Sequence, residues 1–207
     1  MDWSSLSLAA VASSTSGVNL YATVLTLGLM QRFQWLELPT EWQVLGQTWV
    51  IVLAGALFLI EFVADKIPYV DSLWDGIHTF IRVPAGAVLM ASAFADVAPS
   101  AKLAAGLFGG SLALTTHSAK ATARLAANTS PEPFSNIVLS VIEDVAAVFL
   151  LGIAASHPIA ASVLLMIAFC FCCLVLYTCF KFTRMFVAKL SSWFRRKPAQ
   201  PSTVQTH

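Results

Sequence analysis

Charged residues are scarce in this chain, and their scarcity excludes an ordinary soluble domain. Asp, Glu, Lys and Arg make up 11% of the 207 residues, whereas an average soluble domain carries roughly 25%. Hydrophobic residues make up 57%, and the mean hydropathy is +0.75. The net charge of +1 excludes nothing by itself, because the distribution of charge matters more than its sum. The composition predicts an integral membrane protein.

Signatures of common enzymes and of a secretory signal are also missing. The chain has no Gly-x-Ser-x-Gly, His-Glu-x-x-His or phosphate-binding Gly-Lys-Ser/Thr motif, and its start lacks the positive charge of a signal peptide. An enzyme is therefore not favoured, although a membrane hydrolase stays open. The four cysteines lie together at 170–179 and are expected to act as small hydrophobic residues. The metal content stays unknown, and no cofactor is strongly implied.

Apolar windows separated by prolines predict an all-α polytopic membrane bundle. They cover residues 4–33, 44–65, 73–97, 101–127, 134–156 and 159–188, and a crossing needs roughly 20 residues. Small and polar residues interrupt the first window near Gly17 and the fourth at Gly109-Gly110. We read both as broken or re-entrant helices, which leaves four to six full spans.

The two interrupted windows occupy matching places when the chain is shifted by about 90 residues. Gly17 then falls near Gly110, and Pro68 falls on Pro158. Units of three helices contain an odd number of spans, so successive units would be inverted, as in many secondary transporters. The sequence thus predicts two inverted repeats, over 1–97 and 98–190, and a disordered cytoplasmic tail over 191–207.

The distribution of Lys and Arg predicts the orientation. Basic residues gather at the C-terminal end, as Lys181, Arg184, Lys189, Arg195, Arg196 and Lys197. They predict a cytoplasmic C-terminus, and six spans would place the N-terminus in the cytoplasm too. The expected location is the bacterial inner (cytoplasmic) membrane, with several spans and membrane lipids as partners. Because these basic residues adjoin a membrane anchor, nucleic acid is not expected as a partner. A homo-oligomer stays open.

Two charged faces with helical spacing follow one another in the chain. The first contains Asp71, Asp75, His78 and Arg82, and the second contains His117, Lys120, Arg124 and Asn128. Each set falls on one side of a helix. We interpret them as a gate or lock held by ion pairs such as Asp75 with Lys120. The alternative is an anion clamp.

Acidic residues in apolar surroundings are the sharpest functional signal. Glu143 and Asp144 lie near the middle of 137–155, where an acid costs roughly 2.5–3.5 kcal/mol. With Glu61 and Asp65 they are predicted to couple an ion or a proton. The predicted substrate-binding residues are Asn19, His117, Asn136 and Ser140. The alternative for the acids is a structural role as protonated, hydrogen-bonded groups.

Several segments resemble the bacterial membrane family catalogued as domain of unknown function 4126. The resemblance rests on Ser16–Thr23, Glu61–Asp75, Thr116–Lys120 and Ser130–Asn136, and covers about residues 10–155. It implies a multi-helix inner-membrane protein and carries over no activity. It marks as signature positions Asn19, Glu61, Asp65, Asp71, His117, Lys120 and Asn136.

The sequence favours a transporter or channel-like protein for a small ion or solute, coupled to protons or cations. One alternative is a membrane protein that binds or processes an anionic lipid head group through Arg82, Lys120 and Arg124. The other is a non-transporting scaffold whose charges only lock helices together.

Overall fold

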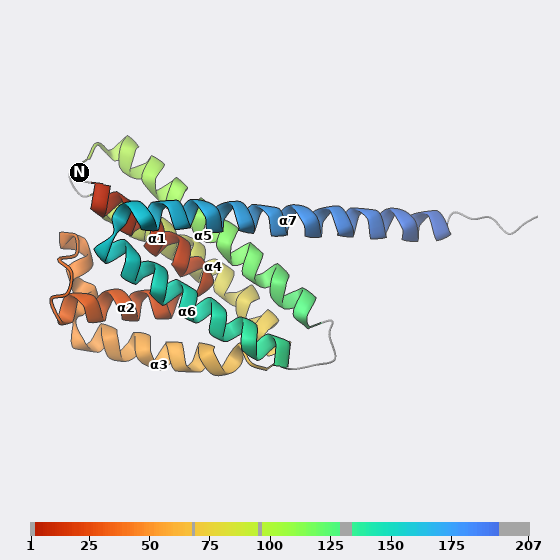
Figure 1. Cartoon of the computed structure of the whole chain (residues 1–207), viewed down its shortest axis with the longest axis horizontal. Helices are drawn as coiled ribbons and strands as arrows, with labels where there is room; N and C mark the ends of the chain where they lie inside the picture. Colours follow the sequence, from red (N-terminus) through yellow and green to blue (C-terminus); the bar gives the residue numbers. More distant parts are fainter. Residues whose placement is uncertain (1–2, 68, 95–96, 129–133, 195–207) are drawn as a thin grey trace, which may run out of the picture.

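The computed structural model describes residues 3–67, 69–94, 97–128 and 134–194, and this part of the chain is a helical bundle without strands (Figure 1). The helices are α1 (Trp3–Val18), α2 (Leu20–Arg32), the 3-10 helix η1 (Thr40–Gly46), α3 (Thr48–Ala64), α4 (Val70–Ser92), α5 (Pro99–Ala127), α6 (Phe134–Ser156) and α7 (Pro158–Phe194). The predicted all-α fold is confirmed, and helix covers most of every predicted window.

Two of these helices are long and apolar enough to cross a membrane. They are the parts of α6 and α7 at Ile137–Ser156 and Pro158–Ser192. A third candidate arises if η1 and α3, which meet at 68°, form one bent span. Large apolar side chains are exposed along the bundle, including Phe80 and Phe149. These features indicate a membrane protein, because water would penalise such a surface.

Helices α1 and α2 form a short helical hairpin. They contain 16 and 13 residues, or roughly 24 and 20 Å, which is less than the hydrocarbon core of about 30 Å. Helix α2 returns antiparallel to α3, with Gly28 against Leu45 and Ile51 (Figure 1). Asn19 forms the turn and caps α2 by accepting a hydrogen bond from the Ala22 amide at 2.9 Å. The predicted interruption near Gly17 is confirmed.

The predicted break at Gly109-Gly110 is wrong, because α5 runs without interruption from Pro99 to Ala127. These glycines let neighbouring helices approach instead. A Cβ on Gly109 would lie 2.6 Å from the Gly86 carbonyl oxygen of α4 and would collide with Met90. Gly17 of α1 packs just as closely on Ala113 of α5. Small residues at helix crossings are common in membrane bundles, where close backbone packing supplies much of the attraction.

The polar run of α1 lies at the centre of the bundle. Ser13 to Ser16 are all buried, between α4 and α5. The Ser13 hydroxyl donates to the Gly86 carbonyl at 2.9 Å, and the Thr116 hydroxyl donates to the Ser14 carbonyl at 2.7 Å. Because hydroxyls that bond to backbone carbonyls are satisfied inside an apolar bundle, this run can form a buried helix.

Helix α7 extends beyond the rest of the bundle. Its 37 residues span roughly 55 Å, and only its first part packs on the other helices (Figure 1). The four cysteines on α7 are free thiols, exposed or half-buried. Helix α7 continues to Phe194, so residues 191–194 of the predicted tail are helical. Residues 195–207 lie outside the described part.

We predict that Gly109→Ala destabilises the protein, because the added methyl group collides with Gly86 and Met90. The free energy of unfolding should fall by about 1–3 kcal/mol, measured by unfolding in detergent. The matched control is Gly152→Ala in α6, where an added Cβ meets nothing within 4 Å. The control should be neutral or slightly more stable, because alanine favours helix. Equal stability of the two variants would contradict close packing at Gly109.

Candidate functional site: a buried ion-pair network

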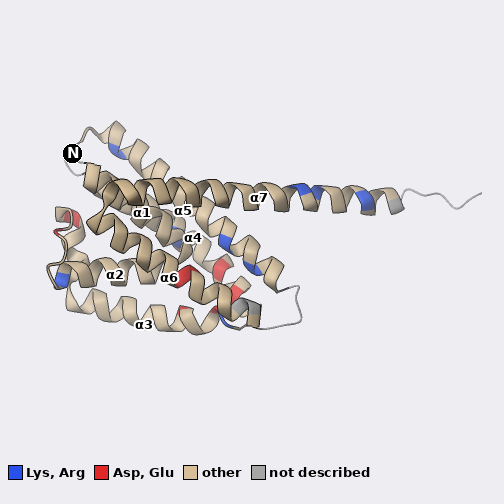
Figure 2. Cartoon of the chain, in the orientation of Figure 1, with Lys and Arg blue, Asp and Glu red and all other residues tan. Residues whose placement is uncertain are grey.

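A network of seven ion pairs lies inside the described bundle, between α3, α4, α5 and α6. Its acidic members are Glu61, Asp65, Asp75 and Glu143, and its basic members are Arg82, Lys120 and Arg124. Six of the side chains are at most 2% exposed, and Glu143 is 14% exposed. Figure 2 shows these charges in the half of the bundle away from the N-terminus.

The Arg82 guanidinium of α4 joins α3 to α5. It donates to Glu61 Oε1 at 2.7 Å and to Asp75 Oδ1 at 2.8 Å. A third bond runs from the same guanidinium to His117 Nδ1 at 3.0 Å. Because Arg keeps its proton in proteins, it is the donor in all three. Arg82 thus binds one residue of α3, one of α5 and one of its own helix.

The Lys120 ammonium lies where three carboxylates converge. Its Nζ is 2.9 Å from Asp65 Oδ2, 3.6 Å from Glu61 Oε1 and 3.8 Å from Asp75 Oδ1. It also donates to the Val18 carbonyl, the last residue of α1, at 3.0 Å. Lys120 therefore occupies the position that a bound cation would take, and it ties the tip of the hairpin to the network.

Arg124 links the end of α3 to α6. It donates to the Asp65 carbonyl at 2.6 Å, to Asp65 Oδ2 at 3.2 Å and to Glu143 Oε2 at 2.8 Å. Glu143, the acid that the sequence singled out, is therefore paired. Its partner lies 19 residues earlier on the adjacent helix, which helical spacing alone does not reveal.

The network has more acids than permanent cations. Four carboxylates face three basic groups. One oxygen each of Glu61, Asp65 and Asp75, and the Nε atoms of Arg82 and Arg124, are buried without a hydrogen-bond partner. Buried polar atoms are normally paired, so unpartnered oxygens call for a specific explanation. Hydrogen-bonding capacity is therefore left unused on both the acidic and the basic side of the network.

Hydrogen bonds fix the protonation of His117. Its Nδ1 accepts from Arg82, so the ring proton is on Nε2, which donates to Thr79 Oγ1 at 2.7 Å. Thr79 in turn donates to the Asp75 carbonyl at 3.0 Å. A proton on His117 Nδ1 would point at the Arg82 guanidinium, which can only donate, so the two donors would repel each other. His117 is therefore a neutral, oriented part of the network.

His78 has the opposite tautomer. Its Nδ1 lies 2.8 Å from the Trp74 carbonyl oxygen, which can only accept, so this nitrogen carries the proton. Its Nε2 lies 3.0 Å from the Tyr21 hydroxyl, and the ring stacks on Trp74 with centroids 4.3 Å apart. His78 therefore connects α4 to α2 of the hairpin.

The two predicted charged faces are both buried, and most of their members meet. Asp75, Arg82, Lys120 and Arg124 join the network, and the expected Asp75–Lys120 contact is present. Asp71 instead lies at the end of the bundle, where it accepts from the Asn128 amide at 3.0 Å. Sequence reasoning missed Thr79, because hydroxyl residues with helical spacing are common in any membrane helix. Tyr21 lies within the Ser16–Thr23 motif, but nothing there pointed to a contact with His78.

At the same end, Lys66 lies between α3 and α4. Its ammonium donates to the Phe62 carbonyl at 2.9 Å, and partial burial lowers the pKa of this group. Lys66 forms none of the seven ion pairs described above.

Asp144 and Asn19 form a second contact at the hairpin. The Asn19 amide donates to Asp144 Oδ1 at 2.8 Å, and both residues are buried. Ser140, one turn earlier on α6, is also buried, with its hydroxyl unpartnered. The side chain of Asn136 lies outside the described part, as does most of the Ser130–Asn136 motif. Of the predicted substrate-binding residues, Asn19 and His117 therefore touch charged groups.

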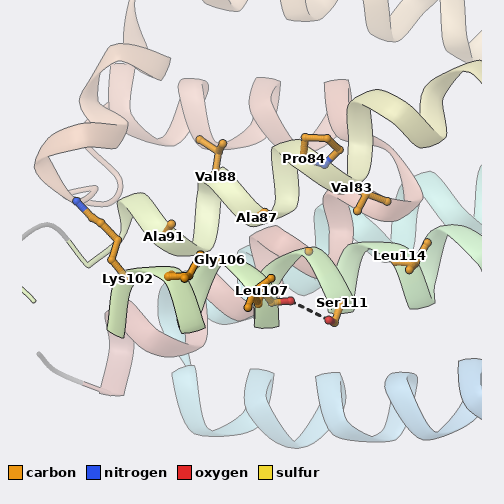
Figure 3. A pocket seen from close by; sticks show the side chains of 12 residues that line it. Val83, Pro84, Ala87, Val88, Ala91, Lys102, Gly106, Leu107, Ser111 and Leu114 are labelled. Atoms are coloured by element: carbon orange, nitrogen blue, oxygen red, sulfur yellow. Dashed lines mark hydrogen bonds between the residues drawn. The ribbon is translucent and has the colours of Figure 1, made fainter. Parts of the chain in front are cut away.

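A cavity of about 310 Å³ reaches the network between α1, α5, α6 and α7. Thr116, Lys120 and Glu143 are among its lining residues, together with the apolar Phe171 and Val175 of α7. A larger groove of about 580 Å³ lies between α4 and α5 (Figure 3). That groove contains no member of the network, whereas the smaller cavity is lined by Lys120 and Glu143.

The fold and the site together define an all-helical membrane protein with a buried ion-pair network. Residues 6–178 match the family described as Domain of unknown function (DUF4126), and the chain belongs to this family, as its motifs indicated. No curated protein and no solved structure gives a match to the chain. Within the described ranges no group of three or more His, Cys, Asp or Glu side chains is arranged to hold a metal ion. Any functional conclusion therefore has to come from the site.

We predict that Arg82→Met is strongly destabilising, because it leaves Glu61 and Asp75 without their closest cation. Removing one partner of a buried pair costs about 3–5 kcal/mol, measured by unfolding in detergent. Adding Glu61→Gln and Asp75→Asn should restore much of the loss, since the unpaired charges disappear. Arg32→Met, at an exposed site, is the control. Failure of the triple variant to recover would contradict the assignment of the loss to unpaired charge.

Proposed function

We propose that this protein transports a small solute or ion across the membrane by alternating access, with coupling to a proton or another cation. The observation that carries this proposal is the buried network at the tip of the α1–α2 hairpin, beside a cavity. Interrupted helices that meet charged residues inside a bundle are the usual form of a transporter binding site.

The geometry of the network supports a gate with exchangeable partners. Arg124 lies between Asp65 and Glu143, and Lys120 lies among three carboxylates. A cation held by several acids can change partner while staying paired, which avoids the full cost of a separated buried charge. Two packings of such pairs provide the two states that alternating access requires.

The cavity lining favours a small solute with a polar group and an apolar body. Lys120, Glu143 and Thr116 can contact the polar group, and Phe171 and Val175 can cover the apolar part. Binding sites of this kind combine a mostly apolar wall with a few placed polar atoms. We assign Glu143 to the exchange of ion-pair partners that couples the gate to transport, because it is the most exposed acid of the network.

The helix directions support two inverted repeats. In Figure 1, α2 runs opposite to α5, α3 runs opposite to α6, and α4 runs opposite to α7. The proposed second repeat starts at 98, next to the first residue of α5. In this arrangement the short α2 corresponds to the first part of α5. Helix α1 has no counterpart in the second repeat.

We further propose five crossings, α3 to α7, in a bacterial inner membrane. Because the α1–α2 hairpin returns to its starting side, the number of crossings is odd, and the two termini lie on opposite sides. Lys and Arg near the end of α7 favour a cytoplasmic C-terminus. The N-terminus is then outside, which differs from the six-span expectation.

The topology can be tested with single cysteines at exposed serines, in a variant whose four native cysteines are serine. We expect Ser4→Cys to react with a membrane-impermeant maleimide in intact cells, and Ser191→Cys to react only after permeabilisation. Both serines are exposed. Equal accessibility of the two sites would mean an even number of crossings and would contradict the proposed hairpin topology.

The two alternatives are less favoured. An anionic head group would need free donors, but Arg82, Lys120 and Arg124 are buried and already donate to carboxylates. A scaffold would explain the ion pairs but gives no reason for a cavity that reaches them. Transport activity separates these functions directly.

Glu143→Gln should keep the fold and abolish coupled transport. Arg124 retains two hydrogen bonds to Asp65, so the structure should stay stable, but the exchangeable charge is gone. The measurement uses proteoliposomes with a trapped pH dye and gradients of sodium, potassium, phosphate, or mixed small monocarboxylates and amines. At least one gradient should drive a pH change with the wild type.

Glu41→Gln in η1, at an exposed site, is the matched control and should transport normally. If Glu143→Gln unfolds, or if it transports as well as the control, the coupling role of Glu143 is wrong. If no gradient produces a signal above empty liposomes, the transport proposal itself loses its support.

A further inference from the structure

The buried acid Asp144 lies outside the ion-pair network and is paired differently. It sits within the membrane-crossing part of α6 and is 6% exposed. Among the described residues, no Lys or Arg approaches it within the 4.0 Å of an ion pair, although every acid of the network has one. The Asn19 amide donates to Oδ1, and Oδ2 is buried without a partner. An ionised carboxylate is costly in such a place.

Two opposing effects act on this carboxyl group. Burial favours the neutral acid, whereas the Asn19 amide and the N-terminus of α2 favour the anion. The other charged groups that act on it are Lys120 on α5, Asp65 at the end of α3, and Lys66 just beyond. Glu143 precedes it on α6 but is turned toward Arg124. Lys120 and Lys66 lie farther from the Asp144 carboxylate than the 4.0 Å of an ion pair, so they stabilise its charge only weakly. Each protonation state of Asp144 is therefore opposed by one of these two effects.

The donor next to Asp144 argues for a proton rather than a metal ion. Sodium or another hard cation needs several oxygen ligands around it. Here the amide nitrogen of Asn19 points at the carboxylate, and the Asn19 side-chain oxygen is already used by the Ala22 amide. A proton needs only one carboxyl oxygen, and Oδ2 is available for it.

We propose that Asp144 binds and releases the proton that is coupled to transport, an inference that rests on the proposed function and names its coupling ion. On release, the O–H bond of the carboxyl group breaks, both electrons stay on the oxygen, and the proton passes to water. The carboxylate that forms is held by the Asn19 amide.

The tip of the hairpin connects this proton site to the network. Two consecutive residues make the two contacts, because the Val18 carbonyl accepts from Lys120 and the Asn19 amide donates to Asp144. A new charge on Asp144 strengthens its hold on Asn19, and any shift of Asn19 moves the carbonyl that Lys120 binds. Proton release can therefore change how Lys120 is shared among Asp65, Glu61 and Asp75.

Infrared difference spectroscopy of the reconstituted full-length protein tests the proton site directly. We expect the C=O band of a protonated carboxyl group, sensitive to deuterium exchange, that disappears as the pH is raised. Asp144→Asn should lose this band, and Glu143→Gln should keep it. The proposal is overturned if Asp144→Asn has the same spectra as the wild type. It is also overturned if the band persists across the whole pH range, because Asp144 is then a permanently neutral structural group.

A second variant keeps the test valid if Asp144→Asn fails to fold. Asn19→Ser preserves a good cap for α2 but is too short to donate to Asp144. Without this donor the anion is less stable, so the band should disappear at a pH about one to two units higher. An unchanged pH would overturn the proposed pairing.

The flux assay separates this proposal from the proposed function. The assay uses the gradient that drives flux in proteoliposomes of the wild type. Under the same conditions, the flux of Asp144→Asn should no longer respond to a pH gradient. A flux that keeps its wild-type pH dependence in this variant overturns the coupling role of Asp144. If the infrared band titrates at Asp144 but no gradient drives flux in the wild type, transport is refuted and coupling with it, while proton binding at Asp144 stands.

Discussion

The burial of three cations among four carboxylates is the constraint on which the rest of this structure depends. In an apolar bundle each of these charges is tolerated only beside its partner. Arg82 must therefore stay between Glu61 and Asp75, and Arg124 between Asp65 and Glu143. These contacts set α3, α4, α5 and α6 in one register along the bundle. They also fix the position of the hairpin tip, because the Lys120 ammonium donates a hydrogen bond to the carbonyl at the end of α1.

The bundle is packed by different means in its two halves. Near the N-terminus, Leu8, Trp42 and Leu89 belong to an apolar core, and the glycines at the crossings of α1, α4 and α5 bring backbones together. The other half is held by ion pairs and hydrogen bonds. Apolar packing of this density resists rearrangement, whereas ion pairs with alternative partners permit it. Movement is therefore expected in the charged half, around the fixed apolar half.

Glu143 and Asp144 show how neighbours in sequence receive different chemistry. Helix α6 turns Glu143 toward Arg124 of α5 and Asp144 toward Asn19 of the hairpin. The first acid is paired with a cation and takes part in a lock. The second has a neutral partner and is suited to hold a proton. A rotation of about 100° per residue is enough to separate the two roles.

The sequence alone determined the helices, the buried charged faces and the turn near Gly17, because apolar length, helical spacing and small polar residues act locally. It also marked Asn19, Glu61, Lys120 and Glu143. Only the tertiary structure decided which charges meet. Helical periodicity places Arg124 and Glu143 on faces, but their contact depends on how α5 and α6 cross and how far each is shifted along its axis. For the same reason Gly109-Gly110 was misread as a break, since a glycine that closes a helix crossing and one that interrupts a helix are identical in sequence.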